Sequence, residues 1–373
     1  MLSKSSKTKQ QNLFYSPLSD MLDMNDPLIA LSNAIDWEIF ENEFSQFYSK
    51  DGSPAKPIRL MVGLLILKQL ENLSDESIVI QWKRNPYYQY FCGYNEMQLC
   101  EPCHSTQLVK FRQRIGKEGM ELIFKVSVQL HGNKAEEKEV LIDTTVQEKN
   151  ITYPTDGKLA IKMIHHLHKI CKKEQLNLRR TFVKEIKEHR INLRFFKHPK
   201  KIKKARSSIK RLRTIVGILI RDISRNLKQD KLSNYTNTFD LFDKVRNQQI
   251  KDSNKVLSLH ESHVYAITKG KDHKKYEYGT KASIVATKDS GVIVGVASHS
   301  KNEHDSKTLE AALISANKTR TTAIKEVICD RGYRGIKEVL GTIISIPGTT
   351  LKKDTEYQKQ QKRDKFKRRA AIE

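Results

Sequence analysis

Apolar residues in the first third of the chain recur at the spacing of helix faces. Across Leu31–Tyr48 they recur about every three or four positions, which is the period of an amphipathic helix. The segment 58–94 is apolar almost throughout its first half and predicts two helices. Ser74 is the expected N-cap of the second, because two acids follow it in the first turn. Pro86 either ends that helix or begins a short new element.

A further helix is predicted from about Ser105 to Leu130, with an interruption near Gly116. Residues 1–30 lack such a pattern and are interpreted as a flexible leader. The pattern therefore predicts a compact helical domain over residues 31–130.

After residue 138 the pattern changes to short apolar, β-branched runs typical of strands. Four stretches have this character: "EVLIDTTVQ", "HVYAITKG" with "YGTKASIVATKDSGVIVGVASHS", "EVICD" and "TIISIPG". In the second of them, "KDSG" marks a hairpin turn after the third strand. Helices are expected over 306–316, in "GIKEVL" and in the basic C-terminal segment. Adjacent strands followed by alternating helices and strands predict an α/β fold, a mixed sheet flanked by helices.

A long helical and strongly basic segment separates the first strand from the others. Residues 157–256 contain 28 Lys and Arg against 8 Asp and Glu, so most of the chain's net charge of +25 lies in about a quarter of its length. Two or three long amphipathic helices are predicted there, broken at Pro199. This excess of positive charge indicates a polyanionic partner, with nucleic acid favoured over a generally basic surface.

The remaining composition excludes several classes of protein. No run approaches the roughly 18 apolar residues of a membrane span, and the N-terminus lacks the apolar segment of a signal peptide. Five cysteines in 373 residues do not form a disulfide scaffold. We therefore expect a soluble, cytoplasmic protein without a membrane partner.

The motif "CEPCH" (100–104) matches the haem-attachment pattern, but haem attachment requires an exported protein. A zinc site would need further ligands, and Cys92 and His131, the nearest candidates, have no recognised spacing. Cys171 and Cys329 lie in apolar surroundings and are expected in the core. A metal site at "CEPCH" is therefore not favoured.

Three acids occupy positions that suggest metal chemistry. Asp143 follows three apolar residues on the first strand, Asp330 ends the strand "EVICD", and Glu373 lies on the last helix. Strand ends gather reactive groups at one edge of a sheet. Converging carboxylates stay ionised together only when cations neutralise them, and oxygen ligands select Mg²⁺ or Mn²⁺. Two such ions could clamp a phosphodiester displacement.

Simpler interpretations of these acids stay open. Asp330 could cap a turn or pair with Arg331 or Arg334, and Arg369 with Glu373 could form a surface pair four residues apart.

Two other polar segments also carry alternatives. Asp305 in "NEHDSKTL" is expected as the N-cap of the next helix, with a role near the reacting groups or on DNA as the alternative. Tyr276 and Tyr278 could stack on an unpaired base, although packing across strands is favoured.

Several of these motifs resemble one family in the same order along the chain. "VLIDTTVQEKNITYPTD", "YEYGTKASIVAT", "ICDRGYRG" and "RRAAIE" resemble DDE-type transposases of bacterial insertion sequences, within the insertion sequence four/five superfamily. The segment from "KPIRLMVGLL" to "KFRQRIG" resembles their N-terminal helical domain. The resemblance spans residues from about 30 to the last one. It implies an RNase H-like catalytic core over 136–373, interrupted by the basic helical insertion 157–256.

The resemblance also implies roles for individual residues. Asp143, Asp330 and Glu373 would be the catalytic acids that bind two Mg²⁺ or Mn²⁺ ions. Tyr333 and Arg369 would assist near the cleaved phosphate. The residues expected to contact DNA are Arg331, Tyr333, Arg334, Arg369 and Lys281.

The implied function is cutting of the element's ends and transfer of the 3′-hydroxyl strand to target DNA, in the bacterial cytoplasm on nucleoid DNA. The partners are double-stranded DNA and a second copy in a homodimer, without a nucleotide cofactor. In the family the helix continues beyond its glutamate, whereas this sequence stops at Glu373. We therefore expect a C-terminally truncated copy, with a catalytically impaired DNA-binding protein as the alternative and a stand-alone RNase H-like nuclease as a further one.

Overall fold

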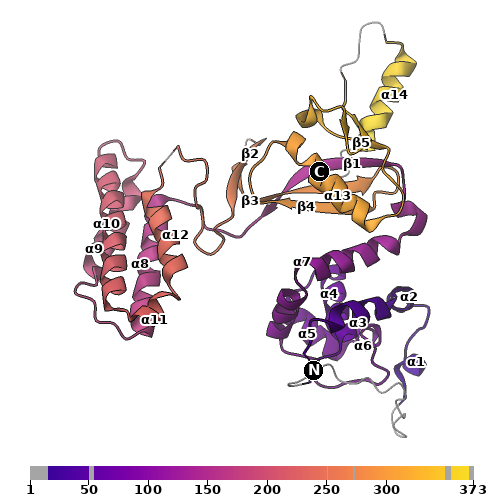
Figure 1. The fold of residues 1–373 in the computed structure, drawn as a ribbon, viewed down its shortest axis with the longest axis horizontal. Coiled ribbons are helices and arrows are strands. Elements are labelled where there is room, and N and C mark those ends of the chain that lie inside the picture. Colours follow the sequence, from indigo (N-terminus) through magenta and orange to yellow (C-terminus); the bar gives the residue numbers. More distant parts are fainter. Residues whose placement is uncertain (1–15, 50–53, 250, 272–273, 349–353, 369–373) are drawn as a thin grey trace.

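The computed structural model describes residues 16–49, 54–249, 251–271, 274–348 and 354–368. These residues form a group of N-terminal helices, a central mixed sheet and a separate helical bundle, each with its own hydrophobic cluster (Figure 1). None of the helices described combines the length and apolar character needed to cross a membrane.

The N-terminal helices pack around α4, which is buried on nearly all sides, as its sequence predicts. Their bounds are α1 Leu18–Met21, α2 Pro27–Ala34, α3 Trp37–Ser45, α4 Ile58–Leu70, α5 Asp75–Arg84, α6 Pro86–Phe91 and α7 Ser105–Gln129. The Ser74 hydroxyl accepts from the backbone N–H of Ser77, which confirms the predicted N-cap. Gly116 has a positive φ of 60° and kinks α7 where the interruption was expected.

Two details of this region differ from the prediction. The helix expected over 31–48 is divided into α2 and α3, because Asp36 caps a new helix by accepting from the Glu38 N–H. Leu18 in the supposed leader is fully buried, and its N–H donates to the Asn95 carbonyl at 2.7 Å. The helical domain that we propose therefore begins by residue 16 rather than at 31.

The sheet is mixed, with both antiparallel and parallel strand pairs. Its strands in the described chain are β1 Glu139–Glu148, β2 Tyr265–Lys271, β3 Lys274–Thr287, β4 Ile293–His299, β5 Glu326–Ile328, β6 Glu338–Val339 and β7 Thr342–Ser345. The order is β2-β3-β1-β5-β7-β6. β4 also pairs with β3, along the part of β3 that does not pair with β2. β3 is antiparallel to β1, β2 and β4, the pairs β1–β5 and β5–β7 are parallel, and β7 and β6 at the far edge are antiparallel. The predicted α/β, RNase H-like mixed sheet flanked by helices is confirmed.

One face of the sheet carries helix α13 (Leu309–Thr319), which packs on β3 and β4. Helix α14 (Glu356–Lys367) begins with a capping box between Thr355 and Gln358. The helix predicted in "GIKEVL" is wrong. Leu340 and Gly341 both have positive φ, so a tight turn joins β6 to β7 as a hairpin.

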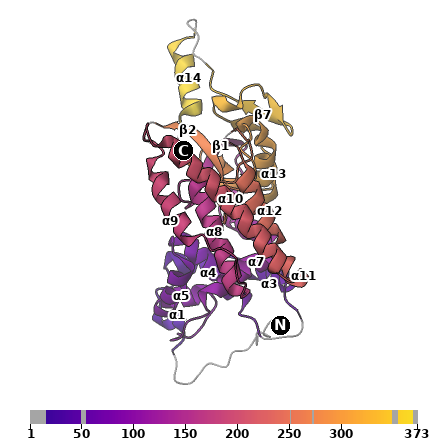
Figure 2. The ribbon, with the colours of Figure 1, turned by 90° about the vertical axis from the view of Figure 1, so that its left-hand side faces the viewer.

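The basic segment between β1 and β2 forms a bundle beside the sheet (Figure 1), and this bundle faces the viewer in Figure 2. Its main helices are α8 Asp156–Lys173, α9 Val183–Asn192, α10 Ile202–Asn226, α11 Gln229–Leu232 and α12 Thr236–Asn247. The apolar faces of α8, α10 and α12 pack together, which leaves the basic residues outside. Pro199 lies in the turn between α9 and α10, where the break was predicted.

Asp75 ties three N-terminal helices together. It opens α5 and accepts two hydrogen bonds from the Arg112 guanidinium of α7, at 2.9 and 2.5 Å, and one from Lys68 of α4 at 2.7 Å. The bond from Arg112, against the effect of burial, lowers the pKa of Asp75 from 3.8 to about 2. Asp75 is only 13% exposed, so solvent screens these contacts little.

We expect Asp75→Asn to lower the free energy of unfolding of the N-terminal helices by about 2 kcal/mol at pH 7. Because the folded pKa is depressed, this stabilisation is present above pH 4 and disappears as the pH falls toward 2. Urea unfolding can be followed by tryptophan fluorescence, since both tryptophans of the chain, Trp37 and Trp82, lie in this cluster. Exposed Glu118→Gln is the matched control. An equal loss of stability at pH 7 and pH 3 would contradict the assignment.

Candidate active site

Two predicted acids lie at matching positions on neighbouring strands. Leu141 of β1 pairs with Ile328 of parallel β5. Asp143 and Asp330 each follow two residues later, and Asp330 still has extended backbone. Since alternate residues of a strand share a face and adjacent strands lie about 4.8 Å apart, the two carboxylates belong to the same face and the same edge of the sheet.

Local backbone contacts orient both carboxylates. Asp143 Oδ1 accepts from the Thr144 N–H at 2.7 Å, and Asp330 Oδ1 accepts from the Gly332 N–H at 2.7 Å. Asp330 thereby caps the short 3₁₀ helix Arg331–Tyr333. The turn-capping interpretation of Asp330 is correct, and it is compatible with a position at the sheet edge.

A third carboxylate, which the sequence interpretation placed differently, lies beside this pair. A Cβ atom placed on Gly332 would lie 2.9 Å from Asp305 Oδ2 and 2.9 Å from Asp330 Oδ1. The two carboxylate oxygens are therefore at most twice that distance from each other. Asp305 Oδ1 also accepts from the Thr144 hydroxyl at 2.9 Å. The N-cap predicted at Asp305 is wrong, because His304 caps the short helix Asp305–Lys307 by accepting from the Ser306 N–H.

Lys281 neutralises Asp305. Its ammonium forms an ion pair with Asp305 Oδ1 and donates to the Glu303 carbonyl at 2.8 Å, and its side chain is only 11% exposed. Burial acts to raise the pKa of Asp305, but the bonds from Lys281 and Thr144 lower it overall. The Lys281–Asp305–Thr144 bridge thus joins β3, the segment before α13 and β1. No spacing rule could have found it, because Thr144 and Asp305 are 161 residues apart.

Of the five residues predicted to contact DNA, Lys281 pairs with Asp305 and Arg369 lies outside the described residues. Arg331 and Arg334 are exposed on either side of Tyr333, close after Asp330 in the chain. Tyr333 is completely buried, so a direct contact with DNA would require it to move. Burial raises the pKa of Tyr333, and the Asp305 and Asp143 carboxylates add to this effect.

The face that carries Asp143 is partly open. A hollow of about 390 Å³ is lined by Leu141 and by Ile284, which pairs with Asp143, together with Arg368 at the end of α14. Glu373 and Arg369 lie outside the described residues. Within the ranges that are described, no group of three His, Cys, Asp or Glu side chains is arranged to hold a metal ion.

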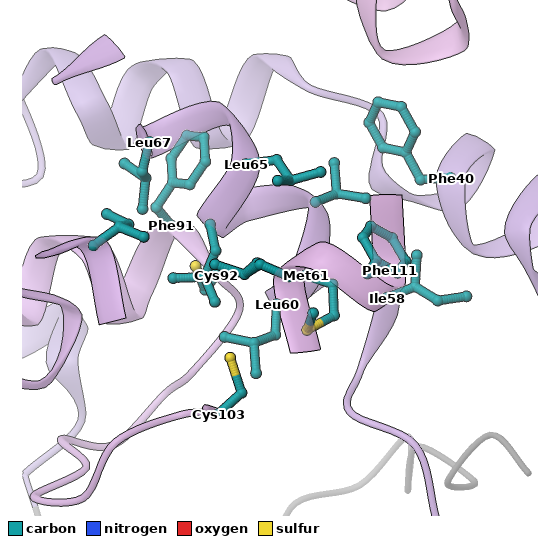
Figure 3. Close-up of a cluster of buried hydrophobic side chains, with 14 of the residues drawn as sticks. Phe40, Ile58, Leu60, Met61, Leu65, Leu67, Phe91, Cys92, Cys103 and Phe111 are labelled. Atoms are coloured by element: carbon teal, nitrogen blue, oxygen red, sulfur yellow. The ribbon is translucent and has the colours of Figure 1, made fainter. Parts of the chain in front are cut away.

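The "CEPCH" cysteine Cys103 and its proposed partner Cys92 lie in the N-terminal hydrophobic cluster (Figure 3). Burial raises the pKa of Cys92 to about 12 and that of Cys103 to about 11. Because a metal binds the thiolate, these thiols are poor ligands at neutral pH. Both cysteines belong to the hydrophobic core, together with apolar residues such as Leu60 and Met61.

Comparison with known proteins finds two matching family models. The family model described as transposase domain (DUF772) matches residues 16–114, and the model described as transposase DDE domain matches residues 252–373. The second match includes Asp305 and Asp330, whereas Asp143 precedes it. The curated "Uncharacterized protein ORF8 in nfe locus" of Rhizobium meliloti is 36% identical over 194 residues, which cover 51% of this chain and 94% of that protein. No solved structure matches.

The narrower assignment to the insertion sequence four/five superfamily stays a prediction. Two transposase domains in the expected order establish the broader family. The chain therefore belongs to the DDE-type transposases of bacterial insertion sequences, enzymes that act on DNA.

Proposed function

We propose that this transposase cuts the ends of its insertion sequence and joins the freed 3′-hydroxyl to target DNA. In the first step a water oxygen attacks the phosphorus and the 3′-oxygen leaves. In the second, that 3′-oxygen attacks a target phosphate and displaces the target's own 3′-oxygen. The matching positions of Asp143 and Asp330 on adjacent strands are the observation that carries this proposal.

The donor set at this edge suits a hard divalent cation, because it consists of carboxylate oxygens. Asp143 and Asp330, joined by Glu373 according to the resemblance, would hold two Mg²⁺ or Mn²⁺ ions. Bound there, the ions supply Lewis-acid activation of the attacking oxygen and neutralise the phosphate. The chain itself contributes carboxylates fixed by the Thr144 and Gly332 N–H groups. Exposed Arg331 and Arg334 can bind the neighbouring phosphates.

The helical regions would bind the DNA. We assign recognition of the terminal repeats to the N-terminal helical domain and general phosphate binding to the bundle. The assignment of the bundle rests on its charge, because no acid occurs between Glu188 and Asp222. This stretch contains the turn between α9 and α10. Pairing two DNA ends calls for a homodimer, and a DNA substrate places the protein in the bacterial cytoplasm.

Binding should depend steeply on salt because many phosphates are contacted. Each lost contact is expected to reduce the slope of log affinity against log salt by about 0.9. We therefore expect replacement of four exposed lysines at the α9–α10 turn by glutamine to flatten this slope: Lys197, Lys200, Lys201 and Lys204. Fluorescence anisotropy between 50 and 200 mM salt, conditions chosen for the assay, measures it.

The control neutralises four exposed cations at the opposite end of the bundle. They are Lys172, Arg179, Arg180 and Lys228. Because α10 is about 37 Å long, the two ends cannot both serve the same short DNA segment. Equal slopes for both variants would sink the assignment of the turn to phosphate binding.

A nicking assay tests the whole proposal. Duplex DNA from the element's ends, incubated with Mn²⁺, should be nicked at those ends and not elsewhere. Salt-dependent binding without nicking would leave only a DNA-binding protein. Cutting that ignores the ends would indicate a general nuclease.

A further inference from the structure

Strands β1 and β3 continue as a paired ribbon well beyond the acidic edge. Their register runs from Val140 opposite Thr287 to Glu148 opposite Gly279, and the Lys149 N–H then donates to the Tyr278 carbonyl at 2.9 Å. In Figure 1 this ribbon reaches from the sheet toward the bundle. It is therefore a physical link between the candidate active site and the basic helices.

The pleat places Tyr278 on the same face of the ribbon as Asp143. Asp143 pairs with Ile284, and Tyr278 lies six residues, an even number, from Ile284 along β3. The exposed residues Thr145 and Gln147 follow Asp143 on this face. At about 3.3 Å per residue, Tyr278 lies about 20 Å from the acid, equivalent to about six nucleotides of a B-form strand.

Tyr278 forms an aromatic pair with Tyr153 from the loop that follows β1. The ring centroids are 5.8 Å apart with planes at 86°, an edge-to-face contact. Tyr153 is 60% exposed although it is a large aromatic residue, so one ring of the pair is open to solvent. Burial, with the neighbouring Tyr153, raises the pKa of Tyr278 to about 12, so this ring stays uncharged at neutral pH.

Two lysines at the start of α8 lie against the same loop. Lys158 Nζ donates to the Tyr153 carbonyl at 3.4 Å, and Lys162 Nζ donates to the Thr152 hydroxyl at 3.3 Å. Both are exposed and one helical turn apart, so their ammonium groups lie against the segment 152–153 that carries the open ring. An exposed aromatic ring on a loop that also holds two cations matches a nucleotide, which presents a base and a phosphate.

We propose that Tyr153, held by Tyr278 and flanked by Lys158 and Lys162, is a stacking site for an unpaired base of the DNA. The base belongs to the strand about six nucleotides from the phosphate that is cut. This inference rests on the proposed function, because it assumes that DNA crosses the face of Asp143. It adds a site that prefers single-stranded or frayed DNA over a closed duplex.

The test compares two DNA probes, a closed duplex and the same duplex with a single-stranded extension of 12 nucleotides, a length chosen for the assay. Tyr153→Ala should weaken binding to the extended probe by about 5- to 100-fold and change binding to the closed duplex little. Tyr153→Phe keeps the ring and is the matched control. It should bind both probes as the original protein does.

A second measurement uses the unaltered protein, so it does not depend on how the variants fold. 2-Aminopurine placed at successive positions of the extension should lose fluorescence on binding, most strongly about six nucleotides from the cut. Equal losses of affinity for both probes, or no quenching at any position, would overturn the stacking site. An unaltered protein that binds neither probe would instead refute the proposed function itself.

Discussion

Replacing Asp143 with asparagine is expected to abolish nicking of the element's ends while DNA binding stays intact. Asparagine has nearly the same shape, and its side-chain oxygen can still accept from the Thr144 N–H. What disappears is the charge that would hold a divalent cation at the sheet edge. Because such an ion contributes several kcal/mol to the transition state, the nicking rate should fall at least about a thousandfold.

The measurement pairs gel assays of nicking in Mn²⁺ with anisotropy of binding in the same buffer. Asp330→Asn should behave in the same way, since Asp330 occupies the corresponding position on β5. Asp240→Asn, an exposed acid of the bundle, is the control and should nick normally. Persistent nicking by Asp143→Asn would remove this acid from the catalytic centre. Loss of binding together with nicking would show a structural defect instead.

Local chemistry made much of the fold predictable. The Ser74 cap, the interruption at Gly116 and the break at Pro199 each depend on a few neighbouring residues. The β-branched runs likewise marked the main strands, because alternation and branching act within one segment. Positions of this kind need no knowledge of the rest of the molecule.

Features decided by distant contacts or by backbone geometry were missed. "GIKEVL" has helical composition, yet Leu340 and Gly341 adopt positive φ and β6 pairs with β7. Asp305 has the sequence context of a helix cap, but its carboxylate instead accepts from the Thr144 hydroxyl and pairs with Lys281. Asp143 and Asp330 could be suspected from their strands. That the two acids occupy matching positions on adjacent strands could be known only from the register of β1 with β5.

The second large effect is expected at the Lys281–Asp305–Thr144 bridge. Lys281→Met would leave Asp305 partly buried, with the Thr144 hydroxyl and the neighbouring His304 as the remaining groups that offset its charge. Removing one partner of such a pair is costlier than removing both, because the remaining charge stays desolvated. We expect the free energy of unfolding of the sheet to fall by about 3 kcal/mol at pH 7.

The dependence on pH should change sign in this variant. With Lys281 present the pKa of Asp305 is lowered, so the pair stabilises the fold above pH 4 and less as the pH falls through the folded pKa. Without Lys281, burial is the largest remaining influence on Asp305, and we expect it to outweigh Thr144 and His304 and to raise that pKa above its unfolded value. Stability is then fully present below pH 4 and decreases as the pH rises.

Hydrogen exchange of peptides that span β3 and β4, at pH 4 and pH 7, measures this difference. The double variant Lys281→Met with Asp305→Asn should regain stability relative to Lys281→Met, because no charge is then left unpaired. Lys288→Met is the matched control, since Lys288 pairs with the more exposed Glu139 and should cost less than about 1 kcal/mol. A double variant no more stable than Lys281→Met would mean that Lys281 acts through packing. Asp305, the third carboxylate beside Asp330, would then keep its negative charge without Lys281.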